Sequence, residues 1–165
     1  MLALDRDAAV DEYDFVAQLI AAPQPSQPSP RVFISYAAED RARVRRLYVR
    51  LRADGYDPWM DVVDLLPGVE WRSAIETALR SAGVALLCLS QTSVAKTGFV
   101  QTEARQVLAL VAELPFGRIG LIPARLEDCD IPMPLRKYQC VDLFRRGGYA
   151  RLTRTLRELV AAPRC

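Results

Sequence analysis

Histidine is absent from this 165-residue sequence, and its absence excludes several common kinds of active site. Without histidine there can be no Ser-His-Asp triad, no Cys-His nucleophile and no histidine metal site. Neither a phosphate-binding P-loop nor a GxGxxG dinucleotide fingerprint occurs. If the protein is an enzyme, its chemistry must therefore run on carboxylates, hydroxyls, backbone dipoles and the substrate's own leaving group.

Cysteine is scarce and widely spaced, at positions 88, 129, 140 and 165. No two of these cysteines form a close pair, so neither a zinc site nor a redox CxxC motif is indicated and no metal is expected. Cys88 and Cys140 fall within apolar segments that read as strands. A small buried thiol is the expected role of both.

Long apolar runs are also missing. None approaches the roughly 20 residues that span a bilayer, and the start of the sequence is acidic, unlike a basic signal peptide. A net charge of +2 gives no reason to expect nucleic acid or an anionic membrane as a partner. With 51% hydrophobic and 25% charged residues, the composition is that of a globular domain, which we expect to be cytoplasmic.

Three segments divide the chain. Residues 1–22 are acidic and weakly helical, and 23–30 (PQPSQPSP) form a linker, because proline at this density lacks amide donors and favours extended geometry. Residues 31–162 form the domain. The first segment is read either as a loosely docked or disordered arm or as a contact helix. The arginines of the last helix form either a solvated face or a surface for an acidic segment such as this arm.

Within the domain, strand-like and helix-like patterns alternate. Strands are predicted at 31–36, 56–61, 84–89, 119–123 and 139–143, with Pro58 placing the second at an edge. Helices are predicted at 40–54, with Asp40 as N-cap, at 69–80, at about 99–113, and after Gly147-Gly148. This alternation predicts an α/β fold with a flavodoxin-like parallel sheet of order 2-1-3-4-5.

The stretch from Ser90 to Leu110 follows the most apolar strand. A polar loop, Ser90–Gly98, runs into an amphipathic helix that carries Phe99 and Glu103 four residues apart, hence on one face. The junction lies at the carboxyl ends of the parallel strands, where ligands bind in such sheets. Glu103 is therefore either a surface glutamate favoured by the helix dipole or a functional carboxylate lining a cleft.

A second unusual loop, 62–70, carries Leu65 and Leu66 before the turn pair Pro67-Gly68. Exposed leucines on such a loop suit a contact with another protein. The alternative is that both leucines fold back onto the domain.

Several segments together resemble the Toll/interleukin-1 receptor (TIR) domain family, bacterial type. They are RVFISYAAED at 31–40, LRADGYDPWMD at 51–61, LPG at 66–68, WRSAIETALRSAGVALLCLS at 71–90, FVQTE at 99–103 and IPARLEDCDIPMPLRKYQCVDLF at 122–144. The family's opening box, second strand, BB loop and W-x-x-x-E position thus occur in the family's order over about 31–160. Phenylalanine replaces the tryptophan of that last motif.

The resemblance implies one of two function classes. Some TIR domains cleave the nicotinamide–ribose bond of NAD+, giving nicotinamide and ADP-ribose or a cyclic ADP-ribose; others are scaffolds that signal by TIR–TIR assembly. The missing histidines are no obstacle to the first class, because a single carboxylate can stabilise the oxocarbenium-like ribose after nicotinamide leaves. We therefore expect an NAD+ glycohydrolase of bacterial antiphage defence that needs no cofactor, is activated by self-association, and answers to a partner that senses infection.

By resemblance, Glu103 occupies the catalytic position and Phe99 offers a flat wall beside it. The remaining residues expected to bind the substrate are Tyr36, Ala37, Ala38, Asp61, Trp71 and Ser90. Asp61 and Trp71 also have structural readings, as a turn cap and a core anchor. Leu65, Leu66, Pro67 and Gly68 are the expected assembly contacts. Ala37 replaces an arginine common in active relatives, which removes a phosphate contact.

Overall fold

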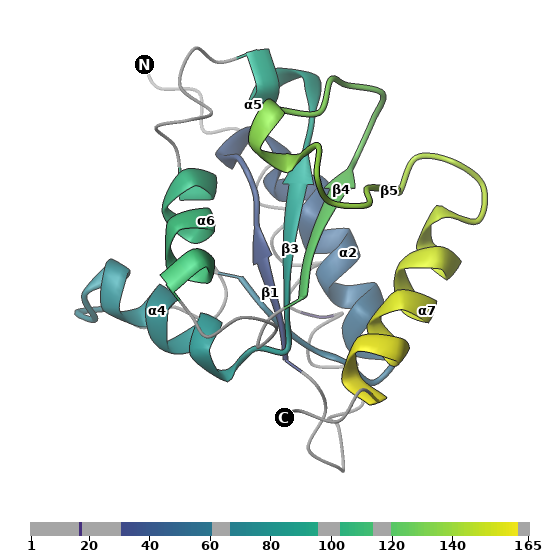
Figure 1. Ribbon diagram of the computed structural model, residues 1–165. Coiled ribbons are helices and arrows are strands. Elements are labelled where there is room, and N and C mark those ends of the chain that lie inside the picture. The colour runs from purple at the N-terminus through teal and green to yellow at the C-terminus, as the bar shows by residue number, and fades with distance from the viewer. Residues whose placement is uncertain (1–16, 18–30, 61–66, 96–102, 114–119, 162–165) are drawn as a thin grey trace, which may run out of the picture.

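The computed structural model describes residues 17, 31–60, 67–95, 103–113 and 120–161, and within these the side chains of Trp71, Glu103, Ala104, Val160 and Ala161 are left undescribed. The domain is a three-layer α/β sandwich with a central sheet and helices on both faces (Figure 1). The strands are β1 (Arg31–Ser35), β2 (Asp57–Trp59), β3 (Val84–Leu89), β4 (Gly120–Arg125) and β5 (Val141–Asp142).

The sheet is parallel throughout and has the order β2-β1-β3-β4-β5, as the sequence predicts. β3 lies at its centre, and all six of its residues are buried. This follows from its sequence, VALLCL, because a central parallel strand is covered on both faces. β2 lies at an edge, where Pro58 does not have to donate to a neighbouring strand.

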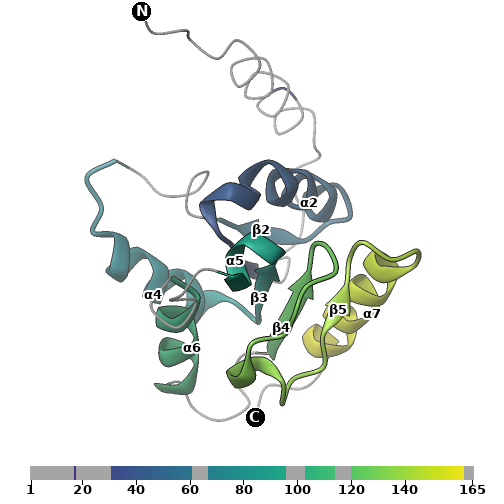
Figure 2. The ribbon, with the colours of Figure 1, turned by 90° about the horizontal axis from the view of Figure 1, so that it is seen from above.

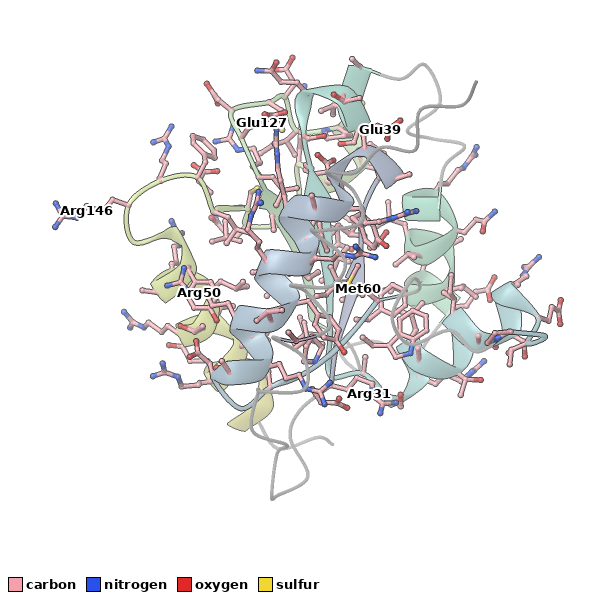
Figure 3. All side chains as sticks on the ribbon, turned by 180° about the vertical axis from the view of Figure 1, so that it is seen from behind. Arg31, Glu39, Arg50, Met60, Glu127 and Arg146 are labelled. Carbon is pink, nitrogen blue, oxygen red and sulfur yellow. The ribbon has the colours of Figure 1, made fainter. Side chains whose placement is uncertain are left out.

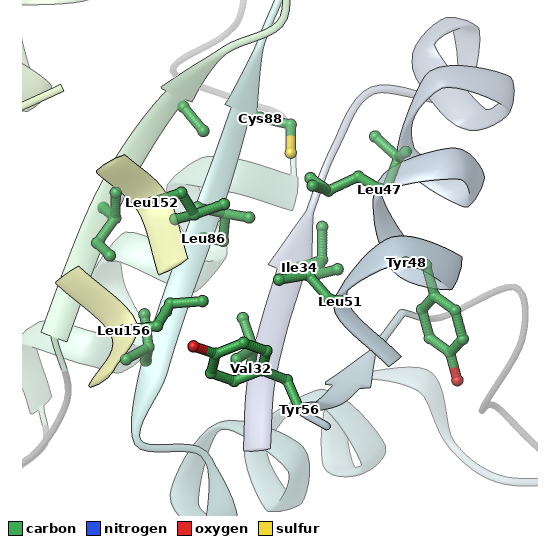
Figure 4. Close-up of a cluster of buried hydrophobic side chains, with 14 of the residues drawn as sticks. Val32, Ile34, Leu47, Tyr48, Leu51, Tyr56, Leu86, Cys88, Leu152 and Leu156 are labelled. Atoms are coloured by element: carbon green, nitrogen blue, oxygen red, sulfur yellow. The ribbon is translucent and has the colours of Figure 1, made fainter. Parts of the chain in front are cut away.

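Two helices cover one face of the sheet: α2 (Arg41–Ala53) and α7 (Gly148–Ala161). Their buried leucines meet alternate residues of the central strands in one cluster (Figure 4). The members contributed by α2 and α7 are Val44, Leu47, Tyr48, Leu51, Leu152 and Leu156. The helical spacing of these residues predicts this face. Gly55 ends α2 with a φ of 86°, a conformation that other residues adopt at a cost.

The opposite face carries α4 (Trp71–Ser81) and α6 (Glu103–Glu113), and the view from above separates the two helical layers (Figure 2). Ile75, Leu79 and Val107 pack there against Phe33 and Leu87 of the strands. β-strand side chains alternate between faces, so β1 and β3 feed both clusters. Among the described helices, none is long and apolar enough to cross a lipid bilayer.

Several elements differ from the sequence expectation. The polar segment after β3 begins with a short helix, α5 (Gln91–Ala95), instead of a loop throughout. β5 covers only two residues and β2 only three, and β4 runs on to Arg125. Cys140 consequently precedes β5 and is half-buried, whereas Cys88 is buried as expected. Leu159, expected on the inner face of α7, is 38% exposed because α7 extends past the edge of the core.

Candidate functional site

The carboxyl ends of the strands form one edge of the domain. β1 runs directly into Tyr36 and a short 3-10 turn, η1 (Ala38–Asp40), and β3 runs into Ser90 and α5. In Figure 3, Glu39 and Glu127 lie at this edge and Arg31 lies at the opposite one. Open parallel sheets bind ligands at this edge, so it is the candidate functional site.

A buried hydrogen bond joins the ends of the two central strands. The Ser90 hydroxyl donates to Asp40 Oδ2 at 2.6 Å, and both residues are nearly inaccessible, Asp40 at 3% and Ser90 at 1% exposure. A buried carboxylate needs such a donor, because an unpaired one would carry a large desolvation cost. Asp40 occupies the N-cap position of α2 as predicted, but its side chain bonds Ser90 instead of capping the helix.

Ser90 also starts α5. Its hydroxyl accepts a hydrogen bond from the Ser93 amide at 3.1 Å, while the Ser93 hydroxyl accepts one from the Ser90 amide at 2.8 Å. This reciprocal pair satisfies two backbone donors at a helix start, in the manner of a capping box. The exchange explains why the polar segment after β3 turns into a helix at once.

A second link ties the end of β4 to the same edge. Glu127 accepts a hydrogen bond from the Gln91 amide at 2.9 Å and pairs with Arg43 of α2 at 2.9 Å. The hydrogen bond from Gln91, followed by that from Arg43, lowers the pKa of the Glu127 carboxyl. Hydrogen bonds and an ion pair therefore link α2, α5 and the segment after β4 at this edge, and together they form its frame.

Cys88, two residues before Ser90, cannot serve as a nucleophile here. Burial first, and the nearby Asp40 carboxylate second, raise the pKa of its thiol. A thiol with a raised pKa stays protonated near neutral pH, and only the thiolate is reactive. Cys88 is thus a packing residue, as the sequence indicates.

The predicted substrate-binding residues at the ends of the central strands come together at this edge. Tyr36 and Ser90 follow neighbouring strands and are buried, whereas Ala37 is half-buried and Ala38 is exposed at the start of η1. The Ala37 carbonyl accepts a hydrogen bond from the Asp40 amide at 2.8 Å, which closes the turn. Their contact with a substrate stays a prediction.

Glu103 is the first described residue of α6. Six residues separate the end of α6 at Glu113 from the start of β4 at the amino edge of the sheet, so Glu103 belongs to the end of α6 that faces the carboxyl edge (Figure 1). Trp71 likewise begins α4. Pro67 and Gly68 lie exposed in a turn, with Gly68 at a φ of 86°. Asp61, Leu65, Leu66 and Phe99 lie outside the described residues.

Three members of this edge were not predicted as site residues. Ser93 lies in none of the segments that resemble TIR domains, Glu127 lies within the segment 122–144 without standing out there, and Asp40 is predicted only as a helix cap. The spacing of Ser90 and Ser93, directly after a buried strand, is the signal that could have revealed the first. Nothing local marks Glu127, because its partners lie 36 and 84 residues away along the chain.

A cavity of about 120 Å³ lies elsewhere, between α4 and α6. Its walls consist of Arg72, Ile75, Gln106, Val107, Ala109, Leu110 and Glu113. It is a groove between two helices and contains none of the predicted site residues. Across the described part of the chain, no group of three or more cysteine and carboxylate side chains is placed to hold a metal ion.

The parallel order 2-1-3-4-5, with its ligand edge formed by η1, α5 and the start of α6, defines a flavodoxin-like α/β class. Comparison with known proteins narrows this class. The family model of the TIR domain matches residues 32–160, and the chain belongs to that family.

Solved structures agree on the fold. The TIR domain of the Toll-related receptor TRR-2 from Hydra magnipapillata is similar with a TM-score of 0.60 and 19% identity, covering 76% of this chain and 97% of that one. A metazoan TIR-STING receptor from C. gigas, in complex with 2′,3′-cGAMP, is similar with a TM-score of 0.61 and 21% identity, over 86% of this chain and 43% of that one.

One curated relative is closer in sequence. The uncharacterized protein y4cD of Sinorhizobium fredii (strain NBRC 101917 / NGR234) is 33% identical over 131 residues, which is 78% of this chain. The matched region spans only 20% of that relative's own length.

Proposed function

We propose that this TIR domain is an NAD+ glycohydrolase that cleaves the nicotinamide–ribose bond, releasing nicotinamide and ADP-ribose or a cyclic ADP-ribose. The observation that carries the proposal is the position of Glu103 at the start of α6, on the edge framed by Asp40 and Ser90. That position holds the glutamate of the W-x-x-x-E motif in the TIR enzymes that this sequence resembles.

The proposed chemistry asks little of the protein besides a fixed negative charge. The bond between C1′ of the ribose and the nicotinamide nitrogen breaks, and its electron pair leaves with nicotinamide, which becomes neutral. The ribose is left oxocarbenium-like, and a carboxylate beside it stabilises this charge. Water then attacks C1′ and releases a proton, or a group of the same substrate attacks and closes a ring. A histidine-free site is sufficient for each step.

The frame at this edge supports this role for Glu103. A carboxylate stabilises a transition state only if its position is set before the reaction, so that no reorganisation is required. The Ser90–Asp40 bond and the Arg43–Glu127–Gln91 link fix the edge from three elements. Tyr36 and Phe99 are proposed to shape the pocket, and Ala37, Ala38, Asp61 and Trp71 to line its rim.

We propose further that the active form is an assembly of copies, with the segment Leu65–Gly68 supplying the contact. The exposed turn at Pro67 and Gly68 supports this, because it projects from the body of the domain before α4. An enzyme that depletes a central cofactor is then silent as a monomer. Its proposed setting is bacterial antiphage defence in the cytoplasm, where a sensing partner triggers assembly.

The test of catalysis is nicotinamide release from NAD+ at high protein concentration, followed by chromatography. The wild-type chain should release nicotinamide, and Glu103→Gln should reduce the rate by at least 100-fold while its circular dichroism spectrum and unfolding midpoint stay unchanged. Glu113→Gln, at the other end of the same helix, is the matched control and should keep the wild-type rate. Equal release by wild type and Glu103→Gln would rule out the catalytic role.

The second candidate is a scaffold that assembles without turnover. The same exposed turn favours it, because assembly needs no catalytic carboxylate. Light scattering and nicotinamide release, measured on one concentration series, separate the two. If the protein is an enzyme activated by assembly, Leu65→Asp should lower both assembly and nicotinamide release. Assembly with no nicotinamide release at any concentration would establish the scaffold.

A further inference from the structure

Outside the candidate site, the strongest feature is a basic surface made by α2 and α7. We call it the arginine face: the exposed arginines of residues 41–50 and 145–157. Figure 3 shows Arg50 between the two helices and Arg146 projecting from the turn before α7. Apart from Arg43, which pairs with Glu127 at the candidate site, neither the proposed catalysis nor the proposed assembly turn uses this surface.

The two helices form one continuous surface because they are bonded to each other. The Tyr149 hydroxyl donates to Asp54 Oδ2 at 2.6 Å, and the guanidinium of Arg50 stacks 3.6 Å from the centre of the Tyr149 ring. A buried hydrogen bond adds to these contacts: the Tyr56 hydroxyl donates to the Thr153 carbonyl at 3.1 Å. These contacts hold the two helices side by side, so their exposed arginines belong to one surface.

The charge of this surface is far from balanced. Residues 41–54 and 145–158 contain eleven arginines against two carboxylates, Asp54 and Glu158, which gives +9. Since the whole chain carries only +2, all other residues together carry −7. Arg46, Arg151 and Arg157 are exposed and form no ion pair with any carboxylate in the part of the chain that the structure describes. A surface of this kind attracts an anionic partner.

We propose that the arginine face binds the acidic N-terminal segment of the same chain, residues 1–22. This segment contains five carboxylates, at positions 5, 7, 11, 12 and 14, and one arginine, a net charge of −4. Arginine pairs well with carboxylates because its planar guanidinium can donate two parallel hydrogen bonds. The proposal stands whether or not the domain cleaves NAD+.

The geometry allows the contact within one chain. β1 begins with Arg31, and this residue bonds Asp57, which follows α2, at 2.8 Å. Arg31, the residue that follows the linker in the sequence, therefore lies on the edge where α2 and α7 also end (Figure 1). Eight residues of extended polyproline chain span roughly 25 Å. The arginine face is about 20 Å long, the length of the 13-residue α2. A tethered ligand also has an effective concentration in the millimolar range.

Two other occupants fit less well. A second copy docked through the same face would bring nine exposed arginines against nine, which is repulsive. A nucleic acid long enough to cover the face would also meet the rest of the domain, which carries −3 once the −4 of residues 1–22 is set apart from the −7. The tethered acidic segment matches the face in sign and in extent.

The experiment measures fluorescence anisotropy with a labelled synthetic peptide of residues 1–22 as probe and the full chain as receptor. Two triple variants of the full chain serve as receptors, and each lacks three negative charges. The first receptor carries Asp7→Asn, Asp11→Asn and Asp14→Asn, which weaken the tethered segment. The second receptor carries Glu70→Gln, Glu113→Gln and Asp130→Asn, which remove three charges elsewhere. The tethered segment competes with the probe, so the first receptor should bind it at least threefold more tightly than the second. Equal affinities would overturn the proposal.

Arginine variants of the first receptor locate the contact. The double variant Arg46→Gln with Arg157→Gln should lower the affinity for the probe at least fivefold relative to the first receptor. The double variant Arg72→Gln with Arg105→Gln, on the opposite helical layer, should leave that affinity within twofold. Equal losses in the two pairs would overturn the proposal. Replacing the probe with a 20-base-pair DNA duplex tests the other class of partner. Tight duplex binding, equal in the wild-type chain and the first receptor, would assign the face to nucleic acid.

Discussion

The Ser90 hydroxyl lies 2.6 Å from Asp40 Oδ2 and joins the segments that follow the two central strands, at the carboxyl edge of the sheet. These residues are 50 positions apart in the chain, and both are buried. The bond holds the β1 turn and the start of α5 in register. It gives the candidate site a rigid base that does not depend on a ligand.

Ser90→Ala should destabilise the domain, because it leaves a buried carboxylate without its donor. A hydrogen bond to a charged group contributes about 1.5–3 kcal/mol, so we expect a loss of about 2 kcal/mol in the free energy of unfolding. Urea unfolding measures it. Ser73→Ala, on the exposed side of α4, is the control and should change the value by less than about 0.5 kcal/mol. A Ser90→Ala loss no larger than that control would mean that the bond adds nothing.

The Arg125–Asp142 pair should make stability sensitive to acid. The guanidinium donates to Asp142 Oδ1 at 2.7 Å, and both side chains are largely buried, at 16% and 24% exposure. This bond lowers the pKa of the Asp142 carboxyl below its usual 3.8. Since the folded-state pKa is depressed, the stabilisation is present above pH 3.8 and is lost as the pH falls through the folded-state value.

Asp142→Asn should therefore cost about 2 kcal/mol at pH 7, and the difference from wild type should shrink progressively below pH 3.8. Asp128→Asn removes a partner of the same guanidinium whose side chain is 79% exposed, and should cost at most about 0.5 kcal/mol. Unfolding by urea across the pH range gives both values. A penalty for Asp142→Asn that stays constant down to pH 2 would contradict the linkage.

The Tyr149–Asp54 bond should act at the opposite end of the pH scale. Burial, followed by the Asp54 carboxylate, raises the pKa of the Tyr149 hydroxyl above its usual 10. A raised folded-state pKa means that the stabilisation is complete below pH 10 and is lost as the pH rises further. Tyr149→Phe should cost about 1 kcal/mol at pH 7 and progressively less above pH 10.

Tyr138→Phe is the matched control for that prediction, because no described partner bonds the Tyr138 hydroxyl. It should cost less than about 0.5 kcal/mol at every pH. Equal penalties for the two variants would show that the contact between α2 and α7 does not depend on the hydroxyl.

Gly148 should tolerate no side chain. A Cβ atom placed there would collide with the Asp142 carbonyl oxygen, which belongs to the backbone and cannot move aside cheaply. Gly148→Ala should cost about 3 kcal/mol, the upper range for overpacking. Gly120→Ala is the comparison, because its Cβ would meet the end of the flexible Leu159 side chain at 2.7 Å, and should cost less than half as much in thermal unfolding. A Gly148→Ala variant as stable as Gly120→Ala would disprove the close approach.

Much of the fold could be read from local patterns. β3 is a run of apolar residues, and the inner face of α2 follows its helical spacing. The bounds of the short edge strands were harder to predict from the sequence. β5, for example, is two residues long, and its length depends on pairing with Ala124 and Arg125. α5 was missed because its start depends on the side-chain exchange between Ser90 and Ser93.

The candidate site divides in the same way. The position of Glu103 at the start of a helix was predictable from the strand that precedes it and the amphipathic pattern that follows it. Asp40 was predicted as a helix cap, because its sequence position fits one. Its bond to Ser90 depends on two side chains 50 positions apart meeting beyond the ends of β1 and β3, and strand order alone does not specify such a contact.

The sequence alone determined the alternation of strands and helices and the residues of the apolar faces, because each depends on neighbours within a few positions. The order of the sheet was predicted from that alternation through the general rules for parallel α/β connections. Tertiary structure decided which polar groups meet: Asp40 with Ser90, Glu127 with Arg43, and the arginines of α2 beside those of α7. Hydrogen bonds and charges act across a few ångströms in space, whatever the distance along the chain.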